Sequence, residues 1–142
     1  MNKKVLIISS SPRKKGNSDL LCDEFLKGAI EAGHRTEKII LKDCKIAYCK
    51  ACDVCQNKKP CVQKDDMASI LQKMIDADVI VIATPVYFYT MCAQLKTLID
   101  RTYARYTEIK KKDFYFILTA ADKRKKNMER AIESFRAFTY CL

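Results

Sequence analysis

Short apolar runs alternate along this chain with longer stretches in which apolar residues return every three or four positions. Val5–Ile8 and Val79–Ala83 are apolar throughout, which is typical of strands buried on both faces of a parallel sheet. Thr36–Leu41 and Phe114–Thr119 have the composition of two further strands. The pattern therefore predicts four strands, separated by segments of a different periodicity.

The segments between the strands carry the spacing of helices. The first predicted helix can be capped by Asn17 or Ser18 and ends at Gly33, with these apolar residues along it: Leu20, Leu21, Phe25, Ala29 and Ile30. Three further helices are predicted, from Asp65 and Asp66 to about Asp76, from Gln94 to Tyr103, and from Asn127 to about Phe138. Strands that alternate with helices form βαβ units. We therefore expect an α/β fold with a doubly wound parallel sheet and helices on both faces.

The order of these elements predicts a single domain over residues 1–142 with one insertion. Between the second strand and the second helix, residues 44–62 follow neither periodicity and are predicted to form a long cysteine-rich loop. The chain stops directly after the fourth helix, where this architecture continues into a fifth strand. We therefore expect a domain that is truncated at its C-terminus and lacks the fifth strand and the last helix.

Composition and charge narrow the class of protein. Nearly half of the residues are hydrophobic, yet no apolar run approaches the roughly 18 residues that span a bilayer, and no signal-peptide pattern precedes the first strand. We expect a soluble, cytoplasmic protein with no membrane partner. The net charge of +10 suits anionic partners, but the lysine runs lack the interleaved aromatic residues of a base-stacking surface. A solvated lysine-rich surface is therefore favoured over nucleic-acid binding.

The segment after the first strand has the features of a phosphate-binding turn. A serine-rich turn leads into a helix start there, so backbone N–H groups, hydroxyls and the positive end of a helix dipole converge. Arg13 can bind a phosphate through its guanidinium, and the other candidate contacts are Ser9, Ser11, Asn17 and Ser18. The alternative is that these residues only cap the helix. Because neither GxGxxG nor GxxxxGK[ST] is present, a mononucleotide fits better than NAD or ATP.

A second candidate segment, Thr84 to Met91, follows the third strand, at the edge where open α/β sheets bind ligands. Thr84-Pro85 is expected to end that strand and to leave an aromatic loop. Three adjacent aromatic residues, Tyr87, Phe88 and Tyr89, cannot all enter one core, so at least one should face the ligand crevice. Flat rings and backbone amides there suit an isoalloxazine ring, and the alternative is hydrophobic packing or a dimer contact.

Four of the eight cysteines form a C-x2-C-x2-C-x5-C run: Cys49, Cys52, Cys55 and Cys61. In a chain without a signal peptide, such a run indicates metal binding or redox chemistry rather than disulfides. One loop of this kind can hold a 4Fe-4S cluster, and the alternatives are redox-active thiols or a structural zinc site. The remaining cysteines are expected to be ordinary core or surface residues: Cys22, Cys44, Cys92 and Cys141. Lysines surround the run with positive charge: Lys45, Lys50, Lys58 and Lys59.

Together these segments resemble the NADPH-dependent FMN reductase-like group of the flavodoxin superfamily, and within it the iron-sulfur flavoproteins. The resemblance rests on SSSPRKKGNS after the first strand, CKACDVCQNKKPCVQKDDM around the cysteines and TPVYFYTMCAQLKTLIDR after the third strand. It implies a flavodoxin-like sheet of order 2-1-3-4-5, non-covalently bound FMN, and a homodimer or homotetramer whose flavin sites lie close to subunit contacts. One departure is Ser10, where the family usually has glycine.

The resemblance also implies which residues make the site. Carried over residue by residue, it places the FMN phosphate at Ser9, Ser11, Arg13, Asn17 and Ser18. It places the flavin ring at Pro85, Val86, Tyr87, Phe88, Tyr89 and Thr90, with Thr119 and Ala120 facing the flavin from the end of the fourth strand. The cysteine spacing matches the compact motif of the iron-sulfur flavoproteins, which implies Cys49, Cys52, Cys55 and Cys61 as ligands of a 4Fe-4S cluster.

The expected function is that of an FMN-dependent oxidoreductase. It would pass electrons from NAD(P)H, as a transient co-substrate, or from a ferredoxin to a quinone, a flavin or another small-molecule acceptor. No side chain stands out as a catalytic acid or base. One alternative is an iron-sulfur/FMN electron carrier without a small-molecule substrate of its own. Another is a zinc-binding, basic nucleic-acid module, which would need the cysteine loop beside a recognition helix.

Overall fold

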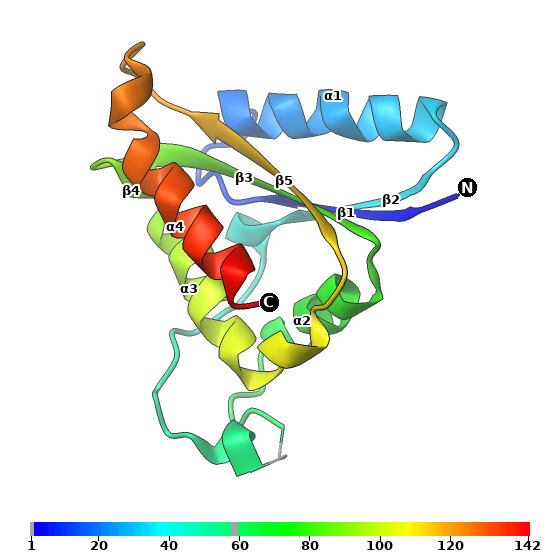
Figure 1. Ribbon diagram of the computed structural model, residues 1–142, viewed down its shortest axis with the longest axis vertical. Helices are drawn as coiled ribbons and strands as arrows, with labels where there is room; N and C mark the ends of the chain where they lie inside the picture. The colour runs from blue at the N-terminus through cyan, green and yellow to red at the C-terminus, as the bar shows by residue number, and fades with distance from the viewer. Residues whose placement is uncertain (1, 58–59) are drawn as a thin grey trace.

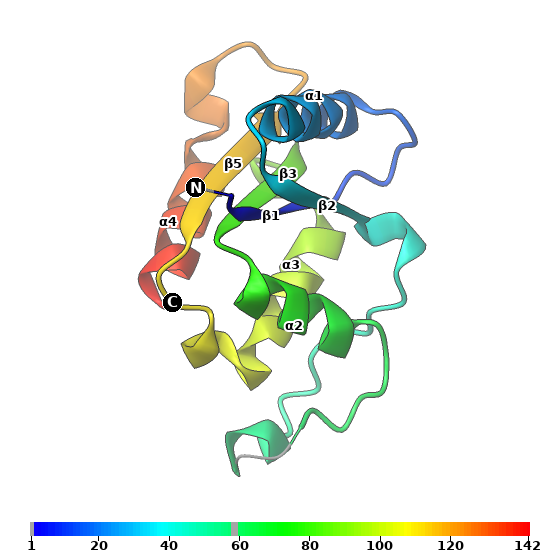
Figure 2. The same ribbon diagram turned by 90° about the vertical axis from the view of Figure 1, so that its right-hand side faces the viewer.

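The sheet is built from four parallel strands: β1 (Lys4–Ser9), β2 (Arg35–Ile40), β3 (Val79–Tyr87) and β5 (Asp113–Thr119). The computed structural model describes residues 2–57 and 60–142 and orders these strands β2-β1-β3-β5 (Figures 1 and 2). This confirms the predicted order for the first four strands, since β5 is the fourth of them along the chain. Over the described residues, no fifth parallel strand is present. Lys58 and Lys59, which the sequence places beside the cysteines, lie outside the described residues.

Helices cover both faces of the sheet, as the sequence predicts. The helices are α1 (Asn17–Glu31), α2 (Met67–Asp76), α3 (Ala93–Arg101) and α4 (Glu129–Tyr140). Alternate residues of the central strands face opposite layers, so that Ile7 and Val81 pack towards α1 while Ile8 and Ile82 pack towards α2 and α3. Figure 1 shows α1 on one side of the sheet and α2 and α3 on the other. Strands that are covered on both faces can be apolar throughout, which explains their sequence.

The segment after Thr84 differs from the sequence expectation. Thr84-Pro85 does not end the third strand, because β3 continues to Tyr87 and then turns back into β4 (Thr90–Met91) as an antiparallel hairpin. The expected aromatic loop is therefore wrong. Pro85 is tolerated because β1 has already ended at the Ser9–Ala83 pair, which leaves β3 with one parallel neighbour there.

The cysteine-rich segment forms a loop that extends from the rest of the domain and is closed at its base. Its two ends are held together by hydrogen bonds between Lys45 and Asp66, with the Lys45 N–H donating to a carboxylate oxygen at 2.6 Å and the Asp66 N–H donating to the Lys45 carbonyl at 3.0 Å. Figures 1 and 2 both show this loop extending past α2 and α3, away from the sheet. Short 3-10 helices lie at Leu41–Asp43, Val54–Asn57, Thr102–Ala104, Tyr106–Glu108 and Lys125–Asn127.

Over the described residues, none of the helices has the length and apolar character needed to cross a membrane.

Candidate functional site

The turn between β1 and α1 presents an uncapped helix start. Helix α1 begins at Asn17, and the preceding Gly16 has extended backbone and provides no side-chain cap. The expected capping by Asn17 or Ser18 is therefore wrong, because both residues lie in the first helical turn. The first-turn N–H groups are left without a side-chain acceptor, which is the arrangement that binds a phosphate. A Cβ at Gly16 would lie 3.0 Å from the Ser11 hydroxyl oxygen, so a side chain there would force that hydroxyl to shift by a few tenths of an ångström.

The three serines of this turn have buried side chains that bond within the protein. Ser9 donates its hydroxyl to Asp19 at 2.9 Å, and Ser10 donates to the Ala83 carbonyl at 2.6 Å. The Ser11 hydroxyl accepts from the Arg13 N–H at 3.2 Å and shapes the turn. Arg13 itself is exposed to solvent. Of the residues expected at the phosphate, Arg13 and the exposed Asn17 therefore have free access to a ligand, whereas the serines hold the turn in place.

A buried ion pair beneath the turn sets its electrostatics. Asp19 lies in the first turn of α1, and Lys38 of β2 reaches its carboxylate at 2.7 Å, with only 11% and 14% of the two side chains exposed. Burial alone would raise the pKa of Asp19, but hydrogen bonds from Lys38 and Ser9 outweigh it and hold the pKa below its ordinary value. Lys38 also pairs with the half-exposed Asp23 at 2.5 Å, so one cation offsets the charge of two carboxylates that would otherwise repel a phosphate bound at this helix start.

The β3–β4 hairpin places aromatic side chains at the carboxyl edge of the sheet. Phe88 and Tyr89 form its two-residue turn, and both have left-handed backbone, with φ of 48° and 68°. Such a turn normally carries asparagine or glycine, so two aromatic residues there are strained. The Phe88 side chain is 97% exposed, whereas the Tyr89 ring lies 5.7 Å from the Arg130 guanidinium of α4. The structure thus exposes aromatic residues at this edge of the sheet, and their contact with a flavin stays a prediction.

A buried polar junction joins the hairpin to the turn between β1 and α1. The Thr84 hydroxyl accepts the Cys92 N–H at 3.1 Å and donates to the Pro85 carbonyl at 2.9 Å. The Cys92 thiol lies 3.2 Å from the Ser10 carbonyl oxygen and also 3.2 Å from the Ser10 hydroxyl. Cys92 is therefore more than an ordinary core residue, because it links the two segments that the sequence assigns to one site.

Thr84→Val is expected to lower the free energy of unfolding by roughly 1–3 kcal/mol, since it leaves the buried Cys92 N–H without an acceptor. Thr84→Ser keeps the hydroxyl and serves as the matched control. Urea denaturation measures both variants. Equal stability of Thr84→Val and wild type would show that the junction contributes nothing.

A cavity of about 600 Å³ opens at the same edge of the sheet. Three residues expected at the flavin or its phosphate lie in its wall: Asn17, Thr119 and Ala120. The sequence did not single out the other lining residues as site residues: Leu20, Leu21, Leu118, Asp122, Lys123 and Met128. Strand pairing places Pro85 opposite Thr119, so the hairpin begins beside this wall. Ser9, Ser11, Arg13, Ser18 and residues 85–90 do not line the cavity itself.

Asp122 shapes the far side of this cavity. Its carboxylate accepts from the Arg124 backbone N–H at 2.8 Å, from the Arg124 guanidinium and from the Asn127 side chain at 2.7 Å. These hydrogen bonds, led by those from the Arg124 side chain, hold the pKa of Asp122 well below its usual range. The Asp-x-Arg spacing of Asp122 and Arg124 after β5 is the sequence signal for this turn.

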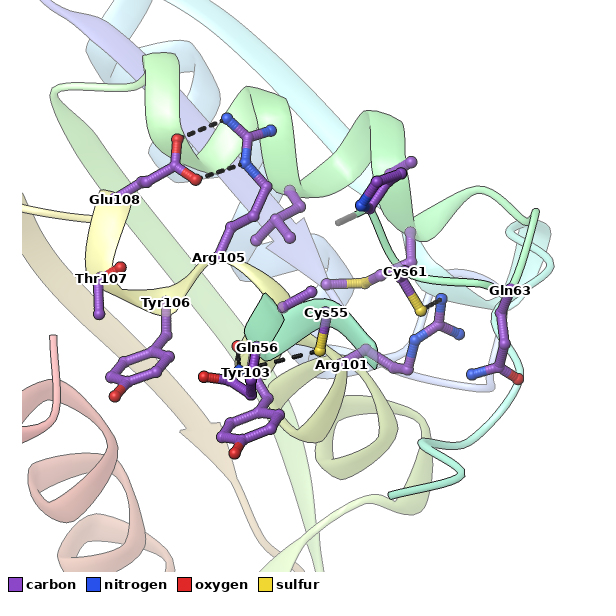
Figure 3. Close-up of a pocket in the computed structure, with 15 residues that line it drawn as sticks. Cys55, Gln56, Cys61, Gln63, Arg101, Tyr103, Arg105, Tyr106, Thr107 and Glu108 are labelled. Carbon is purple, nitrogen blue, oxygen red and sulfur yellow. Dashed lines mark hydrogen bonds and ion pairs between the residues drawn. The ribbon is translucent and has the colours of Figure 1, made fainter. Parts of the chain in front are cut away.

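A second cavity of about 600 Å³ lies beneath the cysteine loop, at the C-terminal end of α3 (Figure 3). Cys55 and Cys61 line it together with Arg101, Arg105, Tyr103 and Tyr106. All eight cysteines are free thiols, and Cys52 is exposed while Cys49 is half-buried. Among residues 2–57 and 60–142, no three His, Cys, Asp or Glu side chains are close enough to hold a metal ion. The structure therefore brings Cys55 and Cys61 to one cavity and leaves the four-cysteine metal site a prediction.

Arg101 fastens the cysteine loop to α3. Its guanidinium binds the Asp65 carboxylate through two hydrogen bonds of 2.7 and 2.9 Å, and it donates to the Ala47 carbonyl at 2.7 Å. Hydrogen bonds from Arg101 hold the pKa of Asp65 below its ordinary value. Sequence reasoning missed this residue. The available signal was a charged residue beside the apolar face formed by Leu95 and Leu98 on the predicted helix.

The chain resembles known proteins over most of its length. A family model described as NADPH-dependent FMN reductase matches residues 3–138. The chain is 44% identical over 99 residues to an iron-sulfur flavoprotein of Methanocaldococcus jannaschii, in a match that covers 70% of this chain and 51% of that protein. It is 41% identical over 99 residues to an iron-sulfur flavoprotein of Methanosarcina thermophila, with coverage of 70% and 52%. The chain thus spans about half the length of the iron-sulfur flavoproteins it matches.

Solved structures support the fold. An NAD(P)H:quinone oxidoreductase from Methanothermobacter marburgensis superposes with a TM-score of 0.81 at 20% sequence identity, covering 99% of this chain and 77% of that one. At this identity the likeness establishes the fold alone, and it agrees with the flavodoxin-like order of the strands. The family model, which extends from β1 into α4, establishes more: this chain belongs to the NADPH-dependent FMN reductase family.

Proposed function

We propose that this chain binds FMN and acts as an oxidoreductase that passes electrons from NAD(P)H or a ferredoxin to a quinone, a flavin or another small-molecule acceptor. The proposal rests on one observation: Asn17 lies at the uncapped start of α1 and also in the wall of the 600 Å³ cavity. A phosphate at the helix start would leave the rest of a mononucleotide pointing into that cavity. FMN, when bound, supplies the redox chemistry, and the protein supplies position and electrostatics.

Different residues of the carboxyl edge of the sheet would bind different parts of FMN. Backbone N–H groups of the first turn of α1 and the Arg13 guanidinium would bind the phosphate, while Lys38 offsets part of the negative charge of Asp19 and Asp23. Thr119 and Ala120 would line one side of the ring, and the hairpin from Pro85 to Thr90 would cover another. Phe88 at the hairpin tip is almost fully exposed, so a nicotinamide or an acceptor could reach this tip from solvent.

We also propose that the cysteine loop holds a 4Fe-4S cluster, which would supply one-electron transfer. Two features of the structure fit such a group. The donors are four free thiols within residues 49–61, and two of them line one cavity. The Nε atom of the buried Arg101, in the wall of that cavity, has no hydrogen-bond partner among the described residues, and a sulfur-rich anionic group would provide one. We further propose that the protein forms a homodimer or homotetramer and that a ferredoxin can be its electron donor.

Arg13→Ala tests FMN binding at the turn. Loss of a charge-assisted hydrogen bond should weaken FMN by roughly 1.5–3 kcal/mol, which is about tenfold to a hundredfold in Kd. Arg35→Ala is the matched control, because Arg35 begins β2 at the opposite edge of the sheet and is also exposed. Fluorescence titration of the flavin-free protein gives both affinities. If Arg13→Ala binds FMN as tightly as wild type does, Arg13 is not part of the phosphate site. If the wild-type protein binds no FMN, the proposed function is wrong.

A further inference from the structure

Arg101 is a buried cation with one unused hydrogen-bond donor beside the cysteine loop. Only 3% of the residue is exposed, although it is fully charged at any physiological pH. Its five N–H groups form a rigid planar fork. Two of them bind the Asp65 carboxylate, a third binds the Ala47 carbonyl, and a fourth points to the Cys61 sulfur at 3.7 Å. The fifth, on Nε, has no partner in the part of the chain that the structure describes.

The free donor and the donor to Cys61 face the same way. In a guanidinium the end-on pair of N–H groups belongs to Nη1 and Nη2, and here that pair is taken by Asp65. The second N–H of Nη2 and the N–H of Nε then point out along one common edge. Because Nη2 reaches Cys61 from this edge, Nε is directed to the same side of the cavity (Figure 3). A buried donor left unsatisfied is unfavourable, so the arrangement favours an acceptor there.

The same residue also fixes the two ends of the loop. Ala47 lies before Cys49 and Asp65 lies after Cys61, so the guanidinium bridges the start and the end of the segment that carries all four cysteines. Asp65 in turn accepts the Ala47 N–H at 3.0 Å. Loop, carboxylate and guanidinium therefore form one connected unit attached to α3, the helix that follows the β3–β4 hairpin.

We propose that Arg101 positions the cysteine loop and donates two N–H groups, from Nη2 and Nε, to the sulfur atoms of the redox centre that this loop holds. The proposal rests on the 4Fe-4S cluster of the proposed function and goes beyond it, because it names a residue outside the cysteine run that sets the properties of the cluster. Hydrogen bonds and positive charge beside the sulfur atoms stabilise the reduced, more negative state. Arg101 therefore makes the cluster easier to reduce.

The test compares Arg101→Gln and Arg101→Lys with Arg105→Gln in the full chain. Arg105 lines the same cavity, but its three nitrogen atoms are already bonded to Glu108 and Gln72. After anaerobic reconstitution with iron and sulfide, a reductive titration followed by EPR gives the midpoint potential of the cluster. Both Arg101 variants should shift it to more negative values, since lysine keeps the charge but not the fork. Arg105→Gln removes a charge from the cavity wall but no donor to the loop, so it should shift the potential less than Arg101→Gln does. FMN affinity should match wild type in every variant.

A second measurement addresses the loop without iron. Hydrogen exchange of the amides of residues 44–57 and 60–66 in iron-free protein should be fastest in Arg101→Gln, intermediate in Arg101→Lys and unchanged in Arg105→Gln. An unchanged potential in both Arg101 variants would overturn the donor role, and unchanged exchange would overturn the positioning role. If the wild-type protein takes up no iron, the proposed cluster is disproved, and the role of Arg101 as a donor to it is disproved as well. The hydrogen-exchange rates of the loop amides would still decide whether Arg101 positions the loop. If Arg101→Gln does not fold, the midpoint potential and the hydrogen exchange are both measured on Arg101→Lys alone.

Discussion

Lys38→Met is expected to lower the free energy of unfolding by about 3 kcal/mol, the scale for removing one partner of a buried ion pair. The substitution leaves the Asp19 carboxylate, 11% exposed, with the Ser9 hydroxyl as its remaining side-chain donor. The bare charge would also lie beneath the helix start that we assign to the FMN phosphate. Lys38→Met should therefore weaken FMN as well as the fold, and urea denaturation with a flavin titration measures both.

The double variant Lys38→Met/Asp19→Asn is the control, because it removes the buried uncompensated charge, whereas Asp23, the other partner of Lys38, is 53% exposed. It should recover much of the lost stability and affinity. Acid titration gives an independent check. The pKa of Asp19 is lower in the folded protein, so its contribution to stability is present above the ordinary carboxyl pKa and is lost as the pH falls through the folded pKa. Asp19→Asn should flatten the acid dependence in that window. A double variant no more stable than Lys38→Met would rule out charge burial as the cause.

The strands and helices were predictable because their burial leaves a direct periodic signal. Val79–Ala83 is apolar at every position, and in the structure the strand is covered on both faces, the setting for which such a run is typical. The helix starting near Asn17 was predicted with its end at Gly33, where the structure has the left-handed backbone that favours glycine, with φ of 80°. Local pattern and tertiary burial agree in these elements.

The hairpin was not predictable by the same reasoning. A two-residue turn of this kind is recognised by asparagine or glycine, and this turn has Phe88 and Tyr89 instead. Pro85 further indicated the end of a strand. The conformation is held by tertiary contacts that a local pattern does not contain, among them the Cys92 N–H on Thr84 and the Arg130 guanidinium over the Tyr89 ring. Strained backbone with exposed aromatic residues is a common property of binding sites.

The candidate site was predicted in its segments but not in its supporting contacts. Arg13 and Asn17 were identified from the turn, and the structure leaves both accessible. The residues that stabilise the site come from distant elements: Lys38 lies 19 positions from Asp19, and Arg101 lies 36 positions from Asp65. Spacing along the chain carries no information about such pairs. The hydroxyls of Ser9 and Ser10 were likewise taken up by partners that only the folded chain brings near.

Cys52→Ser is expected to abolish iron and sulfide binding while FMN stays bound, because the cysteine loop and the carboxyl edge of the sheet are separate parts of the fold (Figure 1). Cys52 is the most exposed of the four loop cysteines, so serine there removes a thiolate without creating a cavity in the core. Cys141→Ser is the matched control at another exposed thiol, and it should bind iron as wild type does. Metal and sulfide analysis after anaerobic reconstitution, with an absorption spectrum, measures both. Zinc without sulfide would assign the loop to a structural metal, and flavin absorbance without any metal in wild-type protein would leave the thiols themselves as the redox groups.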